Sequence, residues 1–315
     1  MRIARVDLDG AERAAIVAPD AETVSVLAPD VSVLELLQAE DRERLAGGGQ
    51  EHPLDEIRLL APLNPPTVRD FSVFEQHIEG ILMGVNAKVP DVWYRSPFCY
   101  FSNPHAVTGP DEDIAVPPGC RELDFELEVA AVIGRAGMNI RPEEAGAYIA
   151  GYTIFNDWSA RDLQMAEMAL GLGLCKGKDF ANTLGPWIVT ADELEPYREG
   201  DRLELDLLVR VNDRGLGHDT LANMAWSFDE LVSYASRGTW VRPGDVLGSG
   251  TCGSGCLLEL RGRHGPEDYP FLQVGDRVSL SVQGIGTLTN RVVAGVEPVE
   301  LAPAEPGRRR GHARE

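Results

Sequence analysis

Three acidic residues alternate with apolar ones between Asp124 and Ala130. Side chains two apart in a β-strand point to the same face, so a strand here would place Asp124, Glu126 and Glu128 side by side. Like charges this close raise one another's pKa, and a hard divalent cation bound by carboxylate oxygens is the usual compensation. The spacing therefore suggests a site for Mg²⁺, Mn²⁺ or Ca²⁺.

An isolated pair of alternating acids more often marks an edge strand with a solvated acidic face. In this chain, however, the acidic segment continues into residues 129–133, which are all apolar. Such a run is typical of a strand buried on both faces. Acids that lead into a buried strand need compensation, and this favours the metal site over the solvated edge.

A second group of polar residues lies in the segment 151–164, which predicts an apolar strand followed directly by a helix. Asp157 or Ser159, at the junction, could simply cap that helix. Arg161 and Gln164 lie three residues apart and therefore share a helix face. A carboxylate, a guanidinium and an amide beside one helix N-terminus would suit an anionic or carbonyl-rich ligand.

The segment 248–253 matches the pattern Gly-x-Gly-x-x-Gly of dinucleotide-binding loops. That fingerprint requires a helix directly after the glycines and an acid about 20 residues further on. The residues that follow, 256–260, have the pattern of a strand instead. We therefore interpret the segment as a glycine-rich turn whose backbone amides can approach a ligand.

The first sixty residues predict a small β-rich unit. Strands are expected at residues 2–7, 14–18 and 23–27, followed by a helix at residues 32–45. Closely spaced prolines then mark a linker and place a domain boundary near Leu63.

We accordingly expect an N-terminal domain of residues 1–63 and a β-rich catalytic domain of residues 64–300. Helices in the larger domain are predicted at residues 141–147, 159–170 and 228–236. The remaining residues, 301–315, are rich in Pro, Gly and Arg and lack apolar periodicity, so this tail is predicted to be disordered.

The chain of 315 residues carries a net charge of −21, which argues against nucleic acid or an anionic membrane as a partner. No apolar run reaches the roughly 18 residues of a membrane span, and no signal-peptide core is present, so a cytoplasmic location is expected. Five scattered cysteines predict free thiols. Cys252 and Cys256 form a lone C-x₃-C without a nearby histidine pair, which disfavours a structural zinc site.

Four motifs together resemble the fumarylacetoacetate hydrolase family. They are Asp124-Phe-Glu-Leu-Glu128, Asn156-Asp-Trp-Ser-Ala-Arg-Asp-Leu-Gln164, Gly177-Lys-Asp-Phe180 and Gly185-Pro-Trp187. The similarity extends over residues 66–298. It implies a mixed, β-rich α+β fold built as a β-sandwich roll, a homodimer, and one divalent metal held by carboxylates, with Mg²⁺ expected and Mn²⁺ or Ca²⁺ as alternatives.

The resemblance also implies the metal ligands, residue by residue. Glu126 and Glu128 match the paired glutamate ligands of the family, and Asp157 matches a later aspartate ligand. Asp70, in Val68-Arg-Asp-Phe71, matches an early aspartate ligand. Four carboxylates from three separate motifs are thus expected to converge on one cation.

His77 matches the family's catalytic histidine, and Glu259 resembles the glutamate that orients it. A histidine titrates near neutral pH, and a carboxylate partner fixes its tautomer and raises its basicity. Such a pair suits general-base activation of water.

Arg161, Gln164 and Lys178 match the polar groups that surround the substrate's carbonyl oxygens in the family. Further substrate contacts are expected from Ser72, Tyr100, Met168 and Thr251. Met168 and Ser72 stand where the enzyme that gives the family its name has tyrosines, so a substrate other than fumarylacetoacetate is expected.

The resemblance implies a hydrolase that cleaves a C–C bond in a β-diketone or acylpyruvate-type acid, with water activated by His77 and Glu259. A decarboxylase, hydratase or keto–enol isomerase acting on a 2-oxo acid at the same metal site is the alternative. A noncatalytic metabolite-binding protein is disfavoured, because every charged group of the site is present. The partner is in each case a small oxo acid, and residues 70–100 are expected to close over it as a lid.

Overall fold

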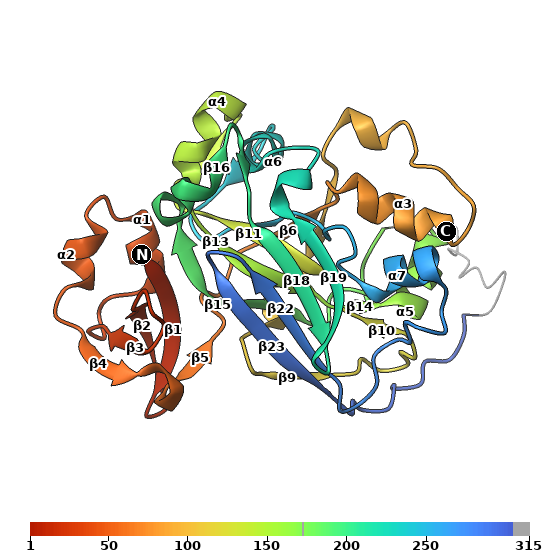
Figure 1. Ribbon diagram of the computed structural model, residues 1–315, viewed down its shortest axis with the longest axis horizontal. Helices are drawn as coiled ribbons and strands as arrows, with labels where there is room; N and C mark the ends of the chain where they lie inside the picture. The colour runs from red at the N-terminus through yellow and green to blue at the C-terminus, as the bar shows by residue number, and fades with distance from the viewer. Residues whose placement is uncertain (172, 305–315) are drawn as a thin grey trace, which may run out of the picture.

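The computed structural model describes residues 1–171 and 173–304 (Figure 1). A large mixed sheet of twelve strands runs through the molecule, and a second sheet of five strands packs against its central strands. Apolar side chains of both sheets, such as Val129, Ile154 and Leu280, share one hydrophobic core. The mixed, β-rich α+β fold expected from the sequence is thereby confirmed.

The order of the main strands in the large sheet begins at the N-terminal edge and ends beside the site described below. These strands are β4 (Gln50–Pro53), β3 (Thr23–Val26), β2 (Ala11–Val17), β1 (Arg2–Leu8), β15 (Asn182–Thr190), β13 (Ile149–Asp157), β11 (Leu127–Ile133), β21 (Val246–Gly248), β6 (Val68–Phe71) and β7 (Cys99–Ser102). Two further strands pair off this path, β5 (Arg58–Leu60) with β1 and β8 (Val107–Thr108) with β15.

The remaining strands form the second sheet and three short ribbons. The second sheet has the order β19 (Arg214–Thr220), β18 (Asp206–Val211), β22 (Arg277–Val282), β23 (Gly286–Val293) and β9 (Asp113–Ala115). The ribbons pair β10 (Leu123–Asp124) with β14 (Ser159–Ala160), β12 (Gly137–Met138) with β20 (Trp240–Val241), and β16 (Arg198–Glu199) with β17 (Arg202–Leu203).

Among the described residues, seven short α-helices lie around the sheets (Figure 1). They are α1 (Val33–Gln38), α2 (Arg42–Ala46), α3 (Glu75–Met83), α4 (Pro142–Ala145), α5 (Arg161–Met168), α6 (Phe228–Ala235) and α7 (Leu257–His264). Single 3₁₀ turns span Leu54–Glu56, Trp93–Arg95, Pro104–Ala106, Gly146–Tyr148 and Leu221–Asn223, and a longer one spans Ala191–Tyr197. In the part of the chain that the structure describes, no helix has the length and apolar character needed to cross a membrane.

The buried strand predicted after the acidic segment is β11. It lies between β13 and β21, and its seven residues are all buried. Six of them are apolar, as expected for a strand that is covered on both faces, and the seventh is Glu128. The adjoining strand β13 is buried along its whole length as well. These two strands therefore hold the acids at their ends in a fixed position within the sheet.

The acidic segment itself is not one continuous strand. β10 ends at Asp124 and β11 begins at Leu127, because the Asp124 carboxylate accepts the amide hydrogen of Phe125 and so interrupts the ladder. The next amide, that of Glu126, donates to the side chain of Asn156 at 3.0 Å. The prediction of one continuous strand is thereby corrected. Asp124 does not join the group formed by Glu126 and Glu128, although Arg161 Nη2 lies 2.8 Å from Asp124 Oδ2 and 2.7 Å from Glu126 Oε1.

Residues 32–45 form two helices instead of the single one predicted. Ser32 and Glu35 make a capping box at the start of α1, which ends at Gln38. Asp41 then caps a new helix, α2, by accepting the amide hydrogen of Arg44 at 3.0 Å. The second cap was overlooked because Asp41 is flanked by other charged residues.

The segment 256–260, predicted as a strand, comprises the N-cap residue Cys256 and the first half of α7. Its apolar residues do not alternate, and its free amides find an acceptor far away in the sequence: Asp124 accepts from Leu257 and Leu258 at 2.8 and 2.9 Å. Helix α3 was not predicted at all. The helix predicted from residue 159 begins at Arg161, because Ser159 and Ala160 pair with β10 instead.

The N-terminal strands join the large sheet directly. Arg2 and Ile3 of β1 pair with Val189 and Ile188 of β15. Figure 1 shows these strands at the end of the molecule opposite helices α3 and α7. Of the tail predicted to be disordered, residues 301–304 are without helix or strand, and the rest lies outside the described residues.

Candidate active site

Four carboxylates meet where the central strands of the large sheet end. Asp70 comes from β6, Glu128 from β11 and Asp157 from the last position of β13, while Glu126 lies just before β11. All four side chains are buried, and one oxygen of each lies within 4.8 Å of the others. We call these residues the carboxylate cluster; they are the four metal ligands that the family resemblance implied.

Gly248 makes this convergence possible. It belongs to β21, which separates β11 from β6, and it faces the cluster. A Cβ atom at this position would lie 2.5 Å from Asp70 Oδ1 and 2.8 Å from Glu128 Oε2. Any side chain would therefore push the two carboxylates apart. The amide of Gly250 completes the arrangement by donating to both acids at 3.1 Å, so the glycine-rich turn serves the cluster.

The acids of the cluster carry strongly altered pKa values. Burial raises the pKa of Asp70 to about 6 and that of Asp157 to about 8. Burial, followed by the charge of Asp70, raises the pKa of Glu128 well above its usual range. Without a cation, the cluster thus retains protons at pH values where free carboxylates have lost them.

A divalent cation fits this donor set. Glu128 Oε1 and Asp157 Oδ1 are buried and have no hydrogen-bond partner among the described residues. Buried carboxylate oxygens without a donor are costly, and oxygen donors of this kind are the ligands that Mg²⁺, Mn²⁺ and Ca²⁺ accept. The four residues of the cluster are therefore the ones that could hold the metal.

Two cationic side chains approach the cluster from one side. Lys178 Nζ contacts Glu126 and Asp157, and Arg161 Nη2 lies 2.7 Å from Glu126 Oε1. Burial alone would raise the pKa of Glu126, but Lys178 and Arg161 outweigh it and hold that pKa well below its usual range. Glu126 is therefore the member of the cluster that stays ionised.

Helix α5 presents its polar residues to the same place. Arg161 Nη1 donates to Gln164 Oε1 at 3.1 Å, as expected for residues on one helix face. The guanidinium is also held by Asp124, whose Oδ2 accepts a hydrogen bond from Arg161 Nε at 2.9 Å. The hydroxyl of Tyr100 donates to Asp157, so this residue contacts the cluster directly.

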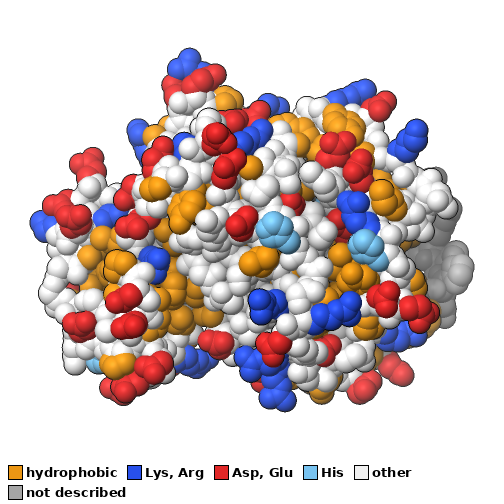
Figure 2. All heavy atoms as spheres, in the orientation of Figure 1, with side chains coloured by type: hydrophobic (Ala, Val, Ile, Leu, Met, Phe, Trp, Pro, Cys, Tyr) orange, Lys and Arg blue, Asp and Glu red, His pale blue; other side chains and the backbone are white. Residues whose placement is uncertain are grey.

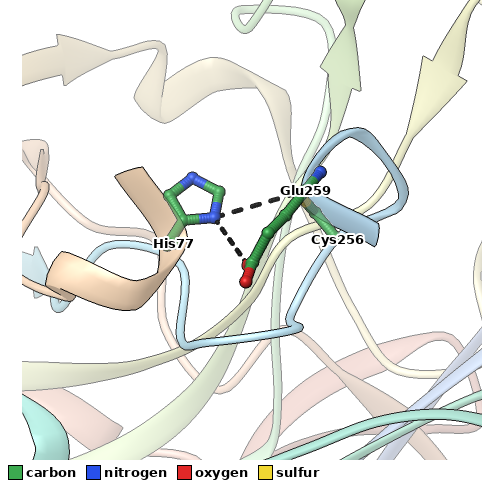
Figure 3. A group of neighbouring side chains, drawn as sticks. All are labelled: His77, Cys256 and Glu259. Carbon is green, nitrogen blue, oxygen red and sulfur yellow. Dashed lines mark hydrogen bonds and ion pairs between the residues drawn. The ribbon is translucent and has the colours of Figure 1, made fainter. Parts of the chain in front are cut away.

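His77 and Glu259 come from helices α3 and α7 and are both buried (Figure 3). His77 Nδ1 lies 3.2 Å from Glu259 Oε2. Burial would raise the pKa of Glu259, but its contacts with His77, Ser254 and Arg263 keep that pKa below its usual range. An ionised Glu259 accepts the Nδ1 hydrogen and leaves Nε2 of the imidazole as the acceptor.

The two helices approach closely at a pair of glycines. A Cβ atom on Gly262 would lie 2.1 Å from the carbonyl oxygen of Gly80, and one on Gly80 would lie 2.2 Å from Glu259 Cγ. Arg263 adds a polar contact, because it donates to Glu259 Oε1 at 2.8 Å and to the carbonyl of Gln76 on α3. Helix α3, which carries His77, is thereby held against α7.

A cavity of about 450 Å³ adjoins these groups. Its polar lining consists of predicted site residues, namely Asp70, Ser72, His77, Tyr100, Glu126, Arg161, Gln164, Lys178 and Thr251. Apolar side chains also line it, among them Ile78, Ile81, Leu82, Met165, Met168, Leu174 and Leu258. Glu128, Asp157 and Glu259 lie behind the wall, where they contact residues that face the cavity.

Sequence reasoning missed three residues that shape this site. Asp124 was assigned to the acidic face, yet it holds both Arg161 and the start of α7. Arg263 would have been found as a partner of Glu259 had the segment been recognised as a helix, since the two are four residues apart. Glu122, which lines the cavity, gave no signal in the sequence.

On the face shown in Figure 2, acidic side chains are spread over the surface with basic ones between them. The charged side chains on this face are thus dispersed, whereas those of the site lie in the interior.

The family model described as fumarylacetoacetate (FAA) hydrolase C-terminal matches residues 67–293. The chain belongs to the fumarylacetoacetate hydrolase family. A second model, described as Rv2993c-like N-terminal, matches residues 1–62. The recognition of the family from four motifs is therefore confirmed.

Relatives in this family are named after different reactions. Fumarylacetoacetase of Arabidopsis thaliana is 29% identical over 306 residues, which cover 77% of this chain and 72% of the relative. Oxaloacetate tautomerase YisK of Bacillus subtilis is 30% identical and covers 78% of this chain and 76% of the relative. The structure of 5-carboxymethyl-2-hydroxymuconate delta-isomerase from Mycobacterium smegmatis matches with a TM-score of 0.70 and 27% identity, covering 93% of this chain and 100% of that chain. Family membership indicates an enzyme without selecting one of these reactions.

Proposed function

We propose that this protein is a divalent-metal-dependent hydrolase that cleaves a C–C bond in a β-diketone or acylpyruvate-type acid. One observation carries the proposal: His77, paired with Glu259, borders the same cavity as Asp70 and Glu126 of the carboxylate cluster. A general base and a cation site that face one cavity are what a hydrolytic cleavage requires. A tautomerisation alone does not need an activated water.

The proposed reaction adds water to the distal carbonyl carbon of an acid R–CO–CH₂–CO–COO⁻. The bond between that carbon and the CH₂ group breaks, and the products are the acid R–COOH and pyruvate. The water oxygen and one of its hydrogens end in R–COOH, while the other hydrogen ends on the methyl group of pyruvate. No oxidant, reductant or organic cofactor is needed.

The side chains around the cavity have separate roles in this proposal. His77 Nε2 takes the proton of the attacking water, because Nδ1 is held by the ionised Glu259. Arg161, Gln164 and Lys178 supply donors and positive charge for the oxyanion that forms when water adds. When bound by the carboxylate cluster, Mg²⁺, Mn²⁺ or Ca²⁺ would act as a Lewis acid on the substrate oxygens, and we propose Mg²⁺.

The apolar lining of the cavity supports a substrate with an apolar distal group. Met168, Ile81 and Leu258 belong to this lining, and the acid Glu122 also lines the cavity. A distal carboxylate near Glu122 would meet a like charge, which is unfavourable. The flexible side chain of Met168 adapts instead to apolar groups of different shape.

Keto–enol isomerisation of a 2-oxo acid is the second candidate. It is favoured by the relative named oxaloacetate tautomerase, which is 30% identical to this chain. The same carboxylates and cationic groups would stabilise the enolate in that reaction, and decarboxylation or hydration would use them in the same way. The two candidates differ in whether the carbon skeleton is cleaved.

A panel of 2,4-diketo acids with apolar, aromatic and carboxylate distal groups, incubated with Mg²⁺ or Mn²⁺, tests the proposal. Loss of the enolate absorbance together with the masses of R–COOH and pyruvate is the expected result. Loss of absorbance with an unchanged product mass would support the isomerase. A product lighter by carbon dioxide would support a decarboxylase.

Other properties predicted from the sequence are also proposals. These are the division into domains of residues 1–63 and 64–300, a cytoplasmic location, a lid formed by residues 70–100, and a homodimer. Exposed apolar side chains on the lid segment, among them Val85, Phe98 and Phe101, support a surface that a second subunit would cover. Sedimentation analysis of the full chain tests the dimer.

A further inference from the structure

Three buried side chains of different donor chemistry meet beside the start of α7 (Figure 3). His77 Nδ1 lies 3.2 Å from Glu259 Oε2 and 3.9 Å from Cys256 Sγ. One donor atom from each residue lies within 4.8 Å of the other two. We call these residues the His–Cys–Glu group; none of them belongs to the carboxylate cluster.

The donor set of this group differs from that of the carboxylate cluster. A thiolate and an imidazole are ligands typical of Zn²⁺, whereas Mg²⁺ and Ca²⁺ prefer oxygen alone. Zinc bonds of about 2.3 Å to sulfur and 2.0 Å to nitrogen or oxygen imply donor separations of about 3.3–3.6 Å in a tetrahedron. The observed separations of 3.2 and 3.9 Å lie just outside this range on either side, so small adjustments would complete the geometry.

We propose that the His–Cys–Glu group is an inhibitory Zn²⁺ site, with a water molecule as the fourth ligand. Zn²⁺ bound to one thiolate, one carboxylate and one neutral imidazole leaves no net charge in the buried group. Arg263 remains paired with Glu259 through the other carboxylate oxygen, Oε1. Of these three residues, His77 lines the cavity, so an ion that enters from the cavity would reach His77 first.

The protons that Zn²⁺ displaces from Cys256 and His77 explain why bound zinc would inhibit the enzyme. The thiol proton of Cys256 is released to solvent, and the hydrogen on His77 Nδ1 has to leave that nitrogen for Zn²⁺ to bind there. It moves to Nε2, so the imidazole stays neutral but presents a hydrogen to the cavity. In this tautomer Nε2 cannot accept a proton from water. The inhibition is therefore expected even when the carboxylate cluster is saturated with Mg²⁺.

The placement of the two ligands on α7 supports the site. Cys256 is the N-cap residue, with its Sγ 3.4 Å from the amide nitrogen of Glu259, so the two side chains lie on one side of the first turn. Serine is a favourable N-cap residue, so Cys256→Ser should retain the helix start while removing the sulfur ligand. Cys252, also buried but outside the group, provides the matched control Cys252→Ser.

The test uses Co²⁺ as a spectroscopic substitute for Zn²⁺, added to protein that is saturated with Mg²⁺. A thiolate bound to Co²⁺ gives an intense near-ultraviolet charge-transfer band, whereas Co²⁺ bound only by oxygen atoms does not. We expect this band in the wild type and in Cys252→Ser, and its loss in Cys256→Ser. Because the readout is absorbance, it does not depend on which reaction the enzyme catalyses.

Zinc titrations complete the test. With excess Mg²⁺ present, Zn²⁺ should inhibit the wild type, and Cys256→Ser should need at least about tenfold more Zn²⁺ for the same fractional inhibition of its own activity. Circular dichroism verifies that the variant is folded. A wild type without the charge-transfer band would overturn the proposal on its own. Inhibition that excess Mg²⁺ relieves would also overturn it, since zinc would then act at the carboxylate cluster.

Discussion

His77 and Glu259 lie 182 residues apart in the sequence, yet Nδ1 of the imidazole is 3.2 Å from Oε2 of the carboxylate. Helices α3 and α7 bring them together, and the glycines Gly80 and Gly262 allow the helix backbones to approach closely. The pair leaves Nε2 of His77 as the proton acceptor beside the cavity. The proposed division of labour, with the base on one side and the carboxylate cluster on the other, rests on this contact.

Replacing His77 by alanine should lower kcat by roughly 10²–10⁴-fold, because the general base is removed. Affinity for Mg²⁺ should change little, since His77 is not a member of the carboxylate cluster. Steady-state kinetics and titration calorimetry measure the two effects separately. His105→Ala, at an exposed histidine, is the control. Near wild-type hydrolysis by His77→Ala would exclude the proposed role.

Replacing Glu126 by glutamine should weaken divalent-metal binding by on the order of 10–100-fold or more, because a charged ligand is lost while the side-chain volume is kept. Turnover should fall in parallel. Glu122→Gln, which alters an acid at the same cavity but outside the cluster, should leave metal affinity nearly unchanged. Equal calorimetric affinities for Glu126→Gln and the wild type would show that the cluster is not the metal site.

The metal-free protein should become less stable as the pH rises from about 4 to 8. Burial raises the pKa of Asp70 to about 6 and that of Asp157 to about 8, whereas an aspartate in an unfolded chain titrates near 3.9. Between these values the folded state binds more protons than the unfolded state, so the free energy of unfolding falls with increasing pH. The stability contributed by these raised pKa values is complete below about pH 4 and is lost above about pH 8.

Thermal unfolding of protein treated with a chelator, measured across this pH range, checks the expectation. The difference in Tm between the wild type and Asp157→Asn isolates the contribution of one group. The Tm of the wild type should fall relative to that of Asp157→Asn as the pH rises. Added Mg²⁺ should increase Tm most at the upper end of the range, where it no longer has to displace protons. A Mg²⁺ effect that is largest at the lower end would be inconsistent with the raised pKa values.

The substrate preference should favour apolar distal groups. Parallel kcat/KM measurements should give a higher value for a diketo acid with an aromatic distal group than for fumarylacetoacetate. Met168→Arg should shift the ratio toward fumarylacetoacetate by about tenfold, because the guanidinium would pair with the distal carboxylate. Met83→Arg, at an exposed apolar residue that does not line the cavity, is the matched control. A tenfold preference of the wild type for fumarylacetoacetate would contradict this assignment of the cavity.

Local patterns were sufficient to predict the strand that is buried on both faces and a helix with one buried face. The seven apolar-rich residues of β11 and the helix at residues 228–236 were recognised, because periodicity and capping residues lie within the segment itself. The ends of helices and strands were not predicted where they depend on residues far away in the sequence. Helix α7 starts where Asp124 accepts its first amides, and no residue near 256 reveals that contact.

The sequence predicted which residues form the candidate site, but not which neighbouring residues hold them in position. Motif resemblance supplied the four members of the carboxylate cluster, and the structure brings them together. The roles of Gly248, which leaves space between Asp70 and Glu128, and of Arg263, which contacts Glu259, depend on contacts between segments far apart in the sequence. Such contacts become visible only once the strands and helices are placed.

Hydrolysis in ¹⁸O-labelled water tests the central claim most directly. The enzyme is incubated with Mg²⁺ and an acylpyruvate that has an apolar distal group, and the masses of the products are measured by mass spectrometry. We predict that the released acid R–COOH carries one ¹⁸O atom from water and that pyruvate forms in equal amount. Complete consumption of the enol form with the carbon skeleton intact and no labelled R–COOH would contradict the hydrolase and leave the isomerase.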